Sequence, residues 1–313
     1  MTINQTLLCL PIFLLFIFSA TTNAQPFSCK SSSKCMSMID YVSPNDTTIL
    51  NITSLFGISK NLLSFLGANN LPATTLSSLP IKAKRTIKIP FPCRCANGTG
   101  TSDGLPIYKK LKIPLPCSCD EVDGEAVVHY GHIVTAGSSV EGIAKQFDIK
   151  EETLLKLNSL AAPGDLKAGA VLDVPLKACK SSISSTSPDY PLLVPNGSYV
   201  FTAANCVNCK CDAANNYTLQ CEPSQMKSSI WPTCPNTRCG SLFLGNGTSS
   251  GCTQTTCAYQ GYDNQTISAK LTTVSTCATN SSPSSATKIS SQGWRWNFLV
   301  AVQLVLLSLH LLQ

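Results

Sequence analysis

The chain has 313 residues, of which 43% are hydrophobic and only 13% are charged, and its formal net charge is +6 at neutral pH. The lysines are spread along the sequence without a run of basic residues, which argues against a surface for nucleic acid or anionic lipid. The 17 cysteines are typical of an oxidising compartment and exclude an ordinary cytosolic protein.

The first residues have the pattern of a secretion signal. An apolar run from Leu7 to Phe18 is followed by Thr22-Asn23-Ala24, which has the small-x-small form of a signal-peptidase site. A membrane-spanning helix is the alternative, but it needs about 20 apolar residues and this run has 12. We therefore expect residues 1–24 to be removed, which leaves Gln25 first and 16 cysteines, enough for eight disulfides.

A terminator motif recurs three times along the mature chain and indicates repeated units. Ile89-Pro90-Phe91-Pro92-Cys93-Arg94-Cys95, then Ile113-Pro114-Leu115-Pro116-Cys117-Ser118-Cys119, then Val174-Pro175-Leu176 each end a β-type segment with proline. The first two copies lie 24 residues apart and the last two 61 apart. One unit has therefore lost more than half of its length.

Residues 120–179 give the clearest prediction of secondary structure. Val127 to Thr135 is of β type, and Ser139 follows a turn and can cap a helix. Thr153 to Leu157 indicates a second helix, and residues 166–175 supply a turn and a returning strand. The predicted order is strand, helix, helix, strand. Its expected core consists of Ile143, Phe147, Leu154, Leu157 and Leu172.

The next region is rich in cysteine and in turn-forming residues. Residues 180–200 are interpreted as a linker, and its Ser-rich start, Lys180 to Asp189, is expected to be flexible. Residues 201–279, with nine cysteines, are typical of a small disulfide-stapled β-rich module. Cys179 is a candidate partner for the odd ninth cysteine.

Residues 280–313 have the pattern of a GPI-attachment signal. The apolar run Phe298 to Leu312 is followed by one residue and no cytosolic lysine or arginine, and it is preceded by a polar spacer and the small residues Ser281 to Thr287. The spacer length favours attachment at Ser284 or Ser285. A short single-pass anchor is the alternative. The expected location is the extracellular face of the cell membrane.

Few residues of the mature chain are suited to catalysis. Its two histidines, His129 and His132, are interpreted as surface or strand residues, and the carboxylates from Asp120 to Glu125 as a solvated loop. A zinc site at Cys206-x-x-Cys209-x-Cys211 with Cys221 is disfavoured because secreted thiols oxidise. The sequence predicts a binding protein without a cofactor rather than an enzyme.

The third unit, residues 120–179, resembles a LysM domain, and the first unit, residues 25–95, resembles one more weakly between Asp40 and Pro90. With the Cys-x-Cys motifs, the Cys-rich module (residues 201–279) and the C-terminal signal, the chain resembles the plant GPI-anchored LysM proteins of the chitin-elicitor-binding type. This implies an α+β fold of tandem βααβ units braced by disulfides and followed by a Cys-rich β or irregular module. The resemblance of the third unit lies in Tyr130, Gly137-Ser138-Ser139, Ile143-Ala144, Phe147, Leu154, Asn158, Leu166, Gly169 and Leu172-Asp173-Val174-Pro175.

The chain departs from the three-unit family pattern in residues 96–119. Leu105 to Lys110 resembles the start of a middle unit and runs at once into Leu111 to Pro114, which resembles its end. Both helices are missing, as a splice form or a gene-model product would explain. The middle unit is a principal sugar-binding site in relatives, so its ligand residues cannot be transferred. The family pattern implies disulfides Cys29–Cys95, Cys35–Cys119 and Cys93–Cys117.

Members of this family bind chitin oligosaccharides, or in a sister group peptidoglycan. By resemblance, the sugar groove lies between the loop after the first strand and the loop after the second helix. A neutral N-acetyl sugar needs backbone hydrogen bonds and apolar contacts there, not charge or metal. The candidate ligand-binding residues are Ala136, Gly137, Ser138, Ser139, Ser159, Leu160, Ala161, Ala162 and Pro163 in the third unit, and Ser43, Pro44, Asn45, Asp46 and Thr47 with Leu71 to Leu76 in the first.

The density of N-x-[ST] sequons agrees with passage through the secretory pathway. An eighth sequon at Asn280 lies beside the presumed GPI-attachment site. The seven expected N-glycosylation sites are Asn45, Asn51, Asn97, Asn196, Asn216, Asn246 and Asn264.

The resulting prediction is a GPI-anchored receptor or co-receptor for chitin in the innate immune perception of microbes, with peptidoglycan as the alternative ligand. A lipid-anchored protein needs a membrane-spanning partner to signal, and the resemblance implies a LysM receptor kinase. A long glycan can gather several copies into a homo-oligomer. The rivals are a structural wall glycoprotein without a soluble ligand, an enzyme, and a lipid-transfer-like protein, whose required Cys-Cys pair is absent.

Overall fold

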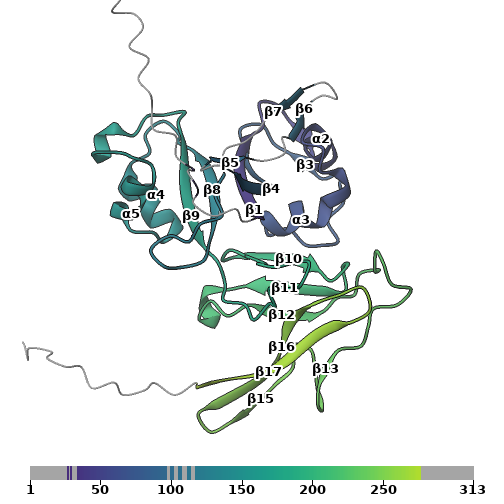
Figure 1. Cartoon of the computed structure of the whole chain (residues 1–313). Coiled ribbons are helices and arrows are strands. Elements are labelled where there is room, and N and C mark those ends of the chain that lie inside the picture. The colour runs from purple at the N-terminus through teal and green to yellow at the C-terminus, as the bar shows by residue number, and fades with distance from the viewer. Residues whose placement is uncertain are drawn as a thin grey trace, which may run out of the picture.

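The computed structural model describes residues 27, 29, 34–96, 99–101, 105–107, 111–113 and 117–275, with side chains described outside 95–116. Two βααβ units lie side by side, and the Cys-rich module lies beneath them in the view of Figure 1. Ser284 and Ser285, and the expected signal peptide, lie outside the described residues. None of the helices in the described ranges is long and apolar enough to cross a membrane.

In the first unit, two short helices pack against an antiparallel strand pair. The threonine hydroxyl of Thr48 caps α2 by accepting a hydrogen bond from the backbone N–H of Asn51 at 3.3 Å. Fully buried Ile49, Phe65, Leu66 and Ile89 form the centre of its core. The elements are β1 (Lys34–Val42), β2 (Thr47–Thr48), α2 (Ile49–Leu55), a 3₁₀ helix (Ser59–Asn61), α3 (Leu62–Ala68), β3 (Pro80–Ile81) and β4 (Thr86–Ala96).

The third unit has the strand, helix, helix, strand order that its periodicity predicts. Ser139 caps α4, since its hydroxyl accepts a hydrogen bond from Gly142 N at 3.0 Å. Ile143, Leu154 and Leu172 are buried, whereas Phe147 and Leu157 are half-buried. The elements are β8 (Val127–Ile133), α4 (Val140–Phe147), α5 (Glu151–Leu157), a 3₁₀ helix (Pro163–Asp165) and β9 (Val171–Lys177).

In both units, an asparagine after the second helix forms the same hydrogen bonds to that helix and to the returning strand. In the third unit, Asn158 Nδ2 donates to the carbonyls of Leu154 and Asp173, and Asn158 Oδ1 accepts from Asp173 N, at 2.7–2.9 Å. In the first unit, Asn69 forms the matching bonds with Phe65 and Lys88 at 2.8–2.9 Å. The two units are therefore structural repeats despite the weaker sequence pattern of the first.

The two units share one β-sheet of strand order β5-β4-β1-β8-β9. Strands β1 and β8 run parallel and pair at Met38–Tyr130 and Ile39–Gly131. Gly131 permits this approach, because a Cβ there would lie 3.2 Å from side-chain carbons of Ile39 and Val171. A single twisted sheet thus holds the units in fixed positions.

The segment between the units contains only short strands in its described residues. Strand β5 (Thr99–Thr101) extends the edge of β4, and β6 (Leu105–Ile107) pairs antiparallel with β7 (Leu111–Ile113). This hairpin joins the stretch that resembles the start of a middle unit directly to the stretch that resembles its end.

The Cys-rich module consists of short antiparallel sheets stapled by disulfides, so the predicted α+β class with a β-rich terminal module is confirmed. Cys179 pairs with Cys211, and the module also contains Cys206–Cys234, Cys209–Cys221 and Cys239–Cys257. Its elements are β10 (Ser198–Thr202), β11 (Val207–Cys211), a 3₁₀ helix (Ala213–Asn215), β12 (Gln220–Pro223), β13 (Arg238–Cys239), β14 (Leu242–Phe243), β15 (Gly247–Ser250), β16 (Thr253–Tyr262) and β17 (Ile267–Ser275).

The segment from Lys180 to Asp189 is not a flexible linker, and that prediction is wrong. Asp189 Oδ2 accepts hydrogen bonds from the Thr202 and Tyr259 hydroxyls, each at 2.7 Å. Ser184 N donates to the carbonyl of Gln260 at 2.8 Å. The serine-rich composition suggested mobility, but these long-range bonds fasten the segment to the module.

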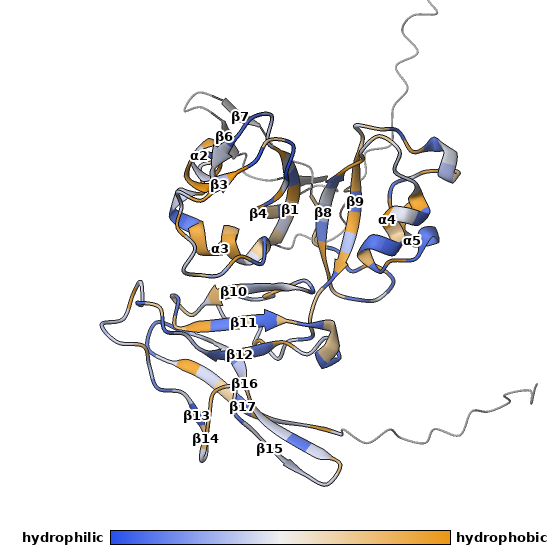
Figure 2. Ribbon diagram, turned by 180° about the vertical axis from the view of Figure 1, so that it is seen from behind, coloured by the Kyte–Doolittle hydropathy of each residue, from blue (hydrophilic) through white to orange (hydrophobic). Residues whose placement is uncertain are grey.

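The Cys-rich module docks on the first unit through α3 and β10. Gly67 lies against the backbone of Tyr199, so that a Cβ at position 67 would overlap the Tyr199 carbonyl oxygen. The Tyr199 hydroxyl donates a hydrogen bond to the carbonyl of Leu71. Figure 2 shows the apolar ribbon of α3 directly above β10. Glycine at position 67 therefore allows the close contact between helix and strand.

Candidate functional site

The two candidate loops of the third unit lie at the same end of the β8–β9 pair. Residues 136–139 follow β8, and residues 159–163 precede β9, while backbone hydrogen bonds of Val134 with Gly169 and Ala170 close that end at 2.8–2.9 Å. Apart from half-buried Ser138 and Leu160, these nine residues are exposed, and none is charged. The loops offer hydroxyl and backbone groups to a neutral ligand.

Local hydrogen bonds hold both of these loops in shape. Thr135 Oγ1 and Ser138 Oγ lie 2.8 Å apart, and Ala162 N donates to Asp165 Oδ2 at 2.9 Å. Gly137 has a φ of +86°, which favours glycine at the tip of the first loop. The site is therefore preformed rather than dependent on ligand for its shape.

In the first unit, the first candidate stretch and the start of α2 are held to residues that follow the second candidate stretch, Leu71 to Leu76. Leu50 N donates to the carbonyl of Ser77 at 2.7 Å, and Thr47 pairs with Ile81. Asp46, however, accepts hydrogen bonds from Ala83 N and Lys82 Nζ at 2.8 and 2.9 Å, and these bonds lower its pKa. The carboxylate of Asp46 is therefore engaged in holding the loop and is not available to a ligand.

Both histidines lie in strand β8, the second of the two expected alternatives, and both are largely buried rather than on the surface. His129 is 2% exposed, and its Nδ1 lies 2.8 Å from Asp173 Oδ2 while Nε2 lies 2.8 Å from the Asp120 carbonyl. Burial alone lowers the pKa of His129, but Asp173 and the Asp120 carbonyl together outweigh burial and raise it. Because both ring nitrogens face acceptors, His129 is suited to a structural role and not to proton transfer with a substrate.

A second buried polar cluster joins the two units across β1 and β8. Asp40 accepts hydrogen bonds from the Tyr130 hydroxyl, from His132 Nδ1 at 2.8 Å and from Ile133 N at 3.1 Å. Burial, followed by the charge of Asp40, raises the pKa of Tyr130, which stays protonated. Sequence reasoning missed this cluster because its partners lie about 90 residues apart.

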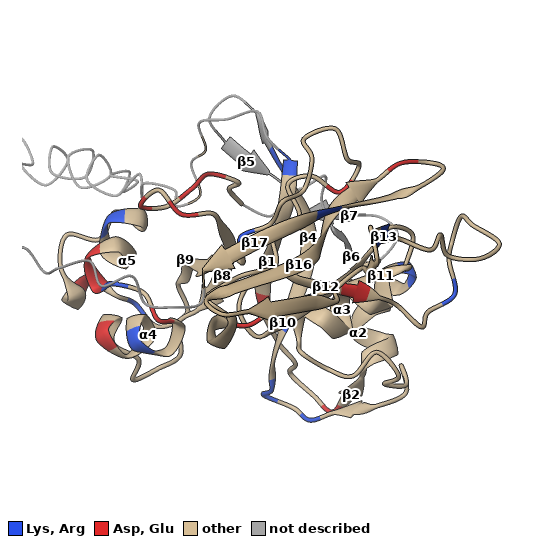
Figure 3. Cartoon of the chain, turned by 90° about the horizontal axis from the view of Figure 1, so that it is seen from below, with Lys and Arg blue, Asp and Glu red and all other residues tan. Residues whose placement is uncertain are grey.

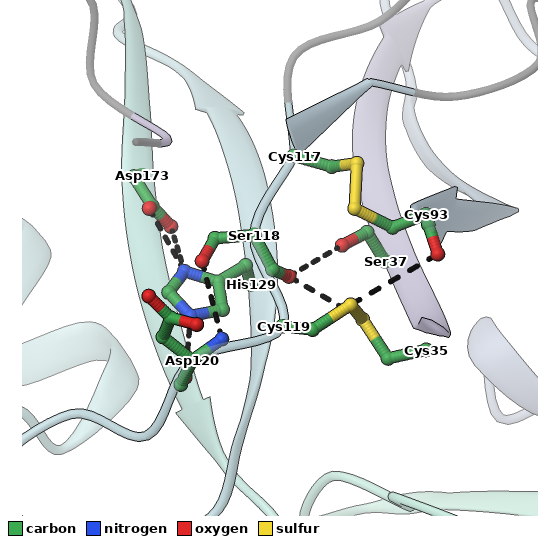
Figure 4. Close-up of a disulfide and its surroundings, with 9 residues drawn as sticks. All are labelled: Cys35, Ser37, Cys93, Cys117, Ser118, Cys119, Asp120, His129 and Asp173. Atoms are coloured by element: carbon green, nitrogen blue, oxygen red, sulfur yellow. Dashed lines mark hydrogen bonds and ion pairs between the residues drawn. A yellow bond between two sulfur atoms is a disulfide. The ribbon is translucent and has the colours of Figure 1, made fainter. Parts of the chain in front are cut away.

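Two disulfides clasp the first unit to the segment that enters the third unit. Cys35 pairs with Cys119 and Cys93 with Cys117, as the family pattern implied. Figure 4 shows the Ser118 carbonyl facing Ser37 and Cys35, and on the other side the His129–Asp173 pair. Cys29 is also disulfide-bonded, whereas the Cys95 side chain lies outside the described part. The cysteines of the considered zinc motif are all in disulfides.

Charged side chains are sparse across the described chain and of mixed sign where they gather, as on α4 and α5 (Figure 3).

The asparagines of six expected glycosylation sites are exposed, and Asn97 lies outside the described residues. The exposed asparagines are Asn45, Asn51, Asn196, Asn216, Asn246 and Asn264.

Comparison with known proteins places these features in context. The model of the LysM domain family matches residues 132–175, within the third unit. The chain is 40% identical to LysM domain-containing GPI-anchored protein 2 of Arabidopsis thaliana, over 99% of this chain and 98% of that protein. It is 36% identical to the chitin elicitor-binding protein of Oryza sativa subsp. japonica, over 88% of this chain and 89% of that protein.

Two solved ectodomains also resemble part of the chain. One is the ectodomain of a receptor like kinase, with 17% identity, a TM-score of 0.35, and coverage of 47% of this chain and 94% of that one. The other is the LYK3 ectodomain, with 14% identity, the same TM-score, and coverage of 46% and 92%.

Proposed function

Because the chain belongs to the family of LysM domain-containing GPI-anchored proteins, we propose that it binds chitin oligosaccharides at the cell surface as a receptor or co-receptor in immune perception. The observation that carries the proposal is the pair of preformed, uncharged loops at one end of the third unit, inside the stretch that matches the LysM domain. An N-acetylglucosamine ring needs such neutral donors and acceptors.

The GPI anchor determines how ligand binding can be signalled to the cell interior. A GPI lipid lies in the outer leaflet, so binding is communicated through extracellular contacts with a membrane-spanning partner, for which a LysM receptor kinase is our proposal. A long chitin chain bridging several copies raises the effective concentration of each weak site, so polymers bind more tightly than short oligomers.

Binding by the third unit is tested by blocking its groove. Ala136→Arg places a long charged side chain in an exposed loop of this groove. We expect the variant to bind chitin hexamer at least tenfold more weakly, a loss of about 1.4 kcal/mol or more of binding free energy. The measurement is calorimetric titration of the full-length protein in detergent. Ala126→Arg, at the opposite end of β8 and also exposed, is the matched control.

Two outcomes would count against the chitin proposal. The first is a wild-type protein that gives no heat with chitin hexamer, and the second is an Ala126→Arg variant as weak as Ala136→Arg. Titration with a soluble peptidoglycan fragment is the parallel arm, and a preference for that fragment would replace chitin by peptidoglycan as the ligand.

The groove of the first unit carries its own sequon, and a glycan there should close it. Asn45 is exposed within the candidate loop. We expect Asn45→Gln, expressed in a glycosylating host, to bind chitin hexamer with a higher stoichiometry than wild type, because the attached glycan occupies the groove. Asn246→Gln, an exposed sequon in the Cys-rich module, should leave the stoichiometry unchanged. A glycan confirmed at Asn45 by mass spectrometry, with no change on its removal, would contradict this prediction.

A further inference from the structure

A cleft of about 390 Å³ opens where the first unit meets the third unit, beside the chain that leads into β10. Its walls come from the end of α3 and the loop after it, the start of β4, strand β8, the end of α4 and Gly197 before β10. Of the candidate sugar-binding stretches, only Leu71 reaches the cleft. Apart from Leu71, the cleft is therefore separate from the candidate sugar-binding loops, and it is formed by the packing of the two units and the residue before β10.

Two cationic side chains, Arg85 and Lys88, line this cleft, and no aspartate or glutamate does. Within the described part of the chain, neither cationic group forms a hydrogen bond or ion pair with a carboxylate. Lys88 is half-buried, with its Nζ 5.5 Å from the centre of the Tyr130 ring. Burial lowers the pKa of Lys88, against the opposing effect of Asp40. A partly desolvated cation in such a place gains from an anionic ligand.

The nearby carboxylate of Asp40 does not fill this role. Its oxygens already accept hydrogen bonds from Tyr130, His132 and Ile133, and its side chain is 1% exposed. Asp40 thus fixes the floor behind the cleft and leaves Arg85 and Lys88 facing it. The lining keeps a positive charge.

The remaining lining is suited to a sugar ring. Asn70 and Gln146 present side-chain amides without hydrogen-bond partners among the described residues. Phe147 is half-buried and is held edge-on against Tyr130 and His132, with ring centres 5.7 and 5.2 Å apart. The cleft volume lies within the range of about 300–1,000 Å³ that is usual for small-ligand sites. Cations, amides and one aromatic face are the groups that an acidic sugar requires.

We propose that this cleft binds a saccharide that carries a carboxylate, with Arg85 and Lys88 holding the carboxylate and Phe147 lying against the ring. Such a sugar can be a uronate of a plant wall polymer or the lactyl-bearing sugar of a bacterial glycan. The chemistry is the same in both cases, and it differs from the neutral chitin proposed for the loops.

The test is calorimetric titration of the full-length protein in detergent with two pairs of probes. Trigalacturonate is compared with its fully methyl-esterified form, and the N-acetylglucosamine–N-acetylmuramic acid disaccharide with chitobiose. We expect at least one acidic probe to bind about tenfold more tightly than its neutral counterpart, and Arg85→Gln and Lys88→Gln each to weaken that binding about tenfold. The acidic probe that binds identifies the source.

Variants elsewhere make the result specific. Lys167→Gln removes an exposed lysine outside the cleft and should leave binding unchanged. Ala136→Arg should also leave it unchanged, which separates this site from the chitin groove. Equal binding of acid and neutral probes, no binding of either acid, or an equal loss in Lys167→Gln and Arg85→Gln would overturn the proposal. Thermal melting of Arg85→Gln, whose side chain is exposed, shows that a loss of binding is not a loss of fold.

Discussion

Replacing His129 by alanine is expected to lower the free energy of unfolding by about 3–5 kcal/mol, because it leaves a buried carboxylate without its partner. Asp173 is 0% exposed, and its side-chain oxygens bond to His129 Nδ1 at 2.8 and 2.9 Å. Urea denaturation of the full-length protein with its disulfides intact measures the loss.

The pH dependence of stability gives this prediction a second readout. The pKa of His129 is raised in the folded protein, so its contribution is present below the unfolded value of about 6.5 and is lost as pH rises through the folded value. Burial also raises the pKa of Asp173. Stability therefore falls with rising pH whether His129 or Asp173 holds the proton between them. We expect the urea midpoint of the wild type to fall as pH rises above the unfolded value of about 6.5, and a variant that lacks both His129 and Asp173 to lose that fall.

A double variant separates the lost pair from a lost side chain. His129→Leu with Asp173→Val removes both partners and should recover most of the stability, since no charge is left buried. A double variant no more stable than His129→Ala would show that shape, not the unpaired carboxylate, determines the loss.

Gly67→Ala is expected to separate the Cys-rich module from the first unit. The added Cβ would overlap the Tyr199 carbonyl oxygen and lie 3.0 Å from the carbonyl carbon, and backbone cannot rotate away as a side chain can. Helix α3 must therefore move from β10, with loss of the Tyr199–Leu71 hydrogen bond. Overpacking of this kind costs about 1–3 kcal/mol.

Small-angle scattering and limited proteolysis report this separation directly. We expect a larger radius of gyration and faster cleavage near residues 195–197 in Gly67→Ala, while the disulfides keep the module itself folded. Gly164→Ala is the matched control, because a Cβ there meets nothing within 4 Å. Unchanged scattering in Gly67→Ala would show that the docked arrangement does not depend on this contact.

Local patterns in the sequence predicted the third unit well. The capping serine Ser139 and the helical spacing of Val140, Ile143 and Ala144 fix α4 within one stretch of chain, and both signals depend only on neighbouring residues. The family resemblance supplied the pairings Cys35–Cys119 and Cys93–Cys117, which spacing alone leaves open.

The remaining features depend on contacts between distant residues, which no local pattern contains. The burial of His129 depends on Asp173, 44 residues away, and the fastening of Asp189 depends on Tyr259, 70 residues away. The parallel pairing of β1 and β8 and the inter-unit cleft arise from the packing of whole units. The family resemblance assigns a candidate glycan groove to loops of each unit, but it does not contain the contacts that occupy Asp46.

The shared sheet has a mechanical consequence. Since β1 and β8 pair side by side in the five-stranded sheet, a load applied to either of the two units is shared with the strands of the other. We expect the two units to unfold together, in a single event in a force-extension trace, rather than one after the other as independent domains would.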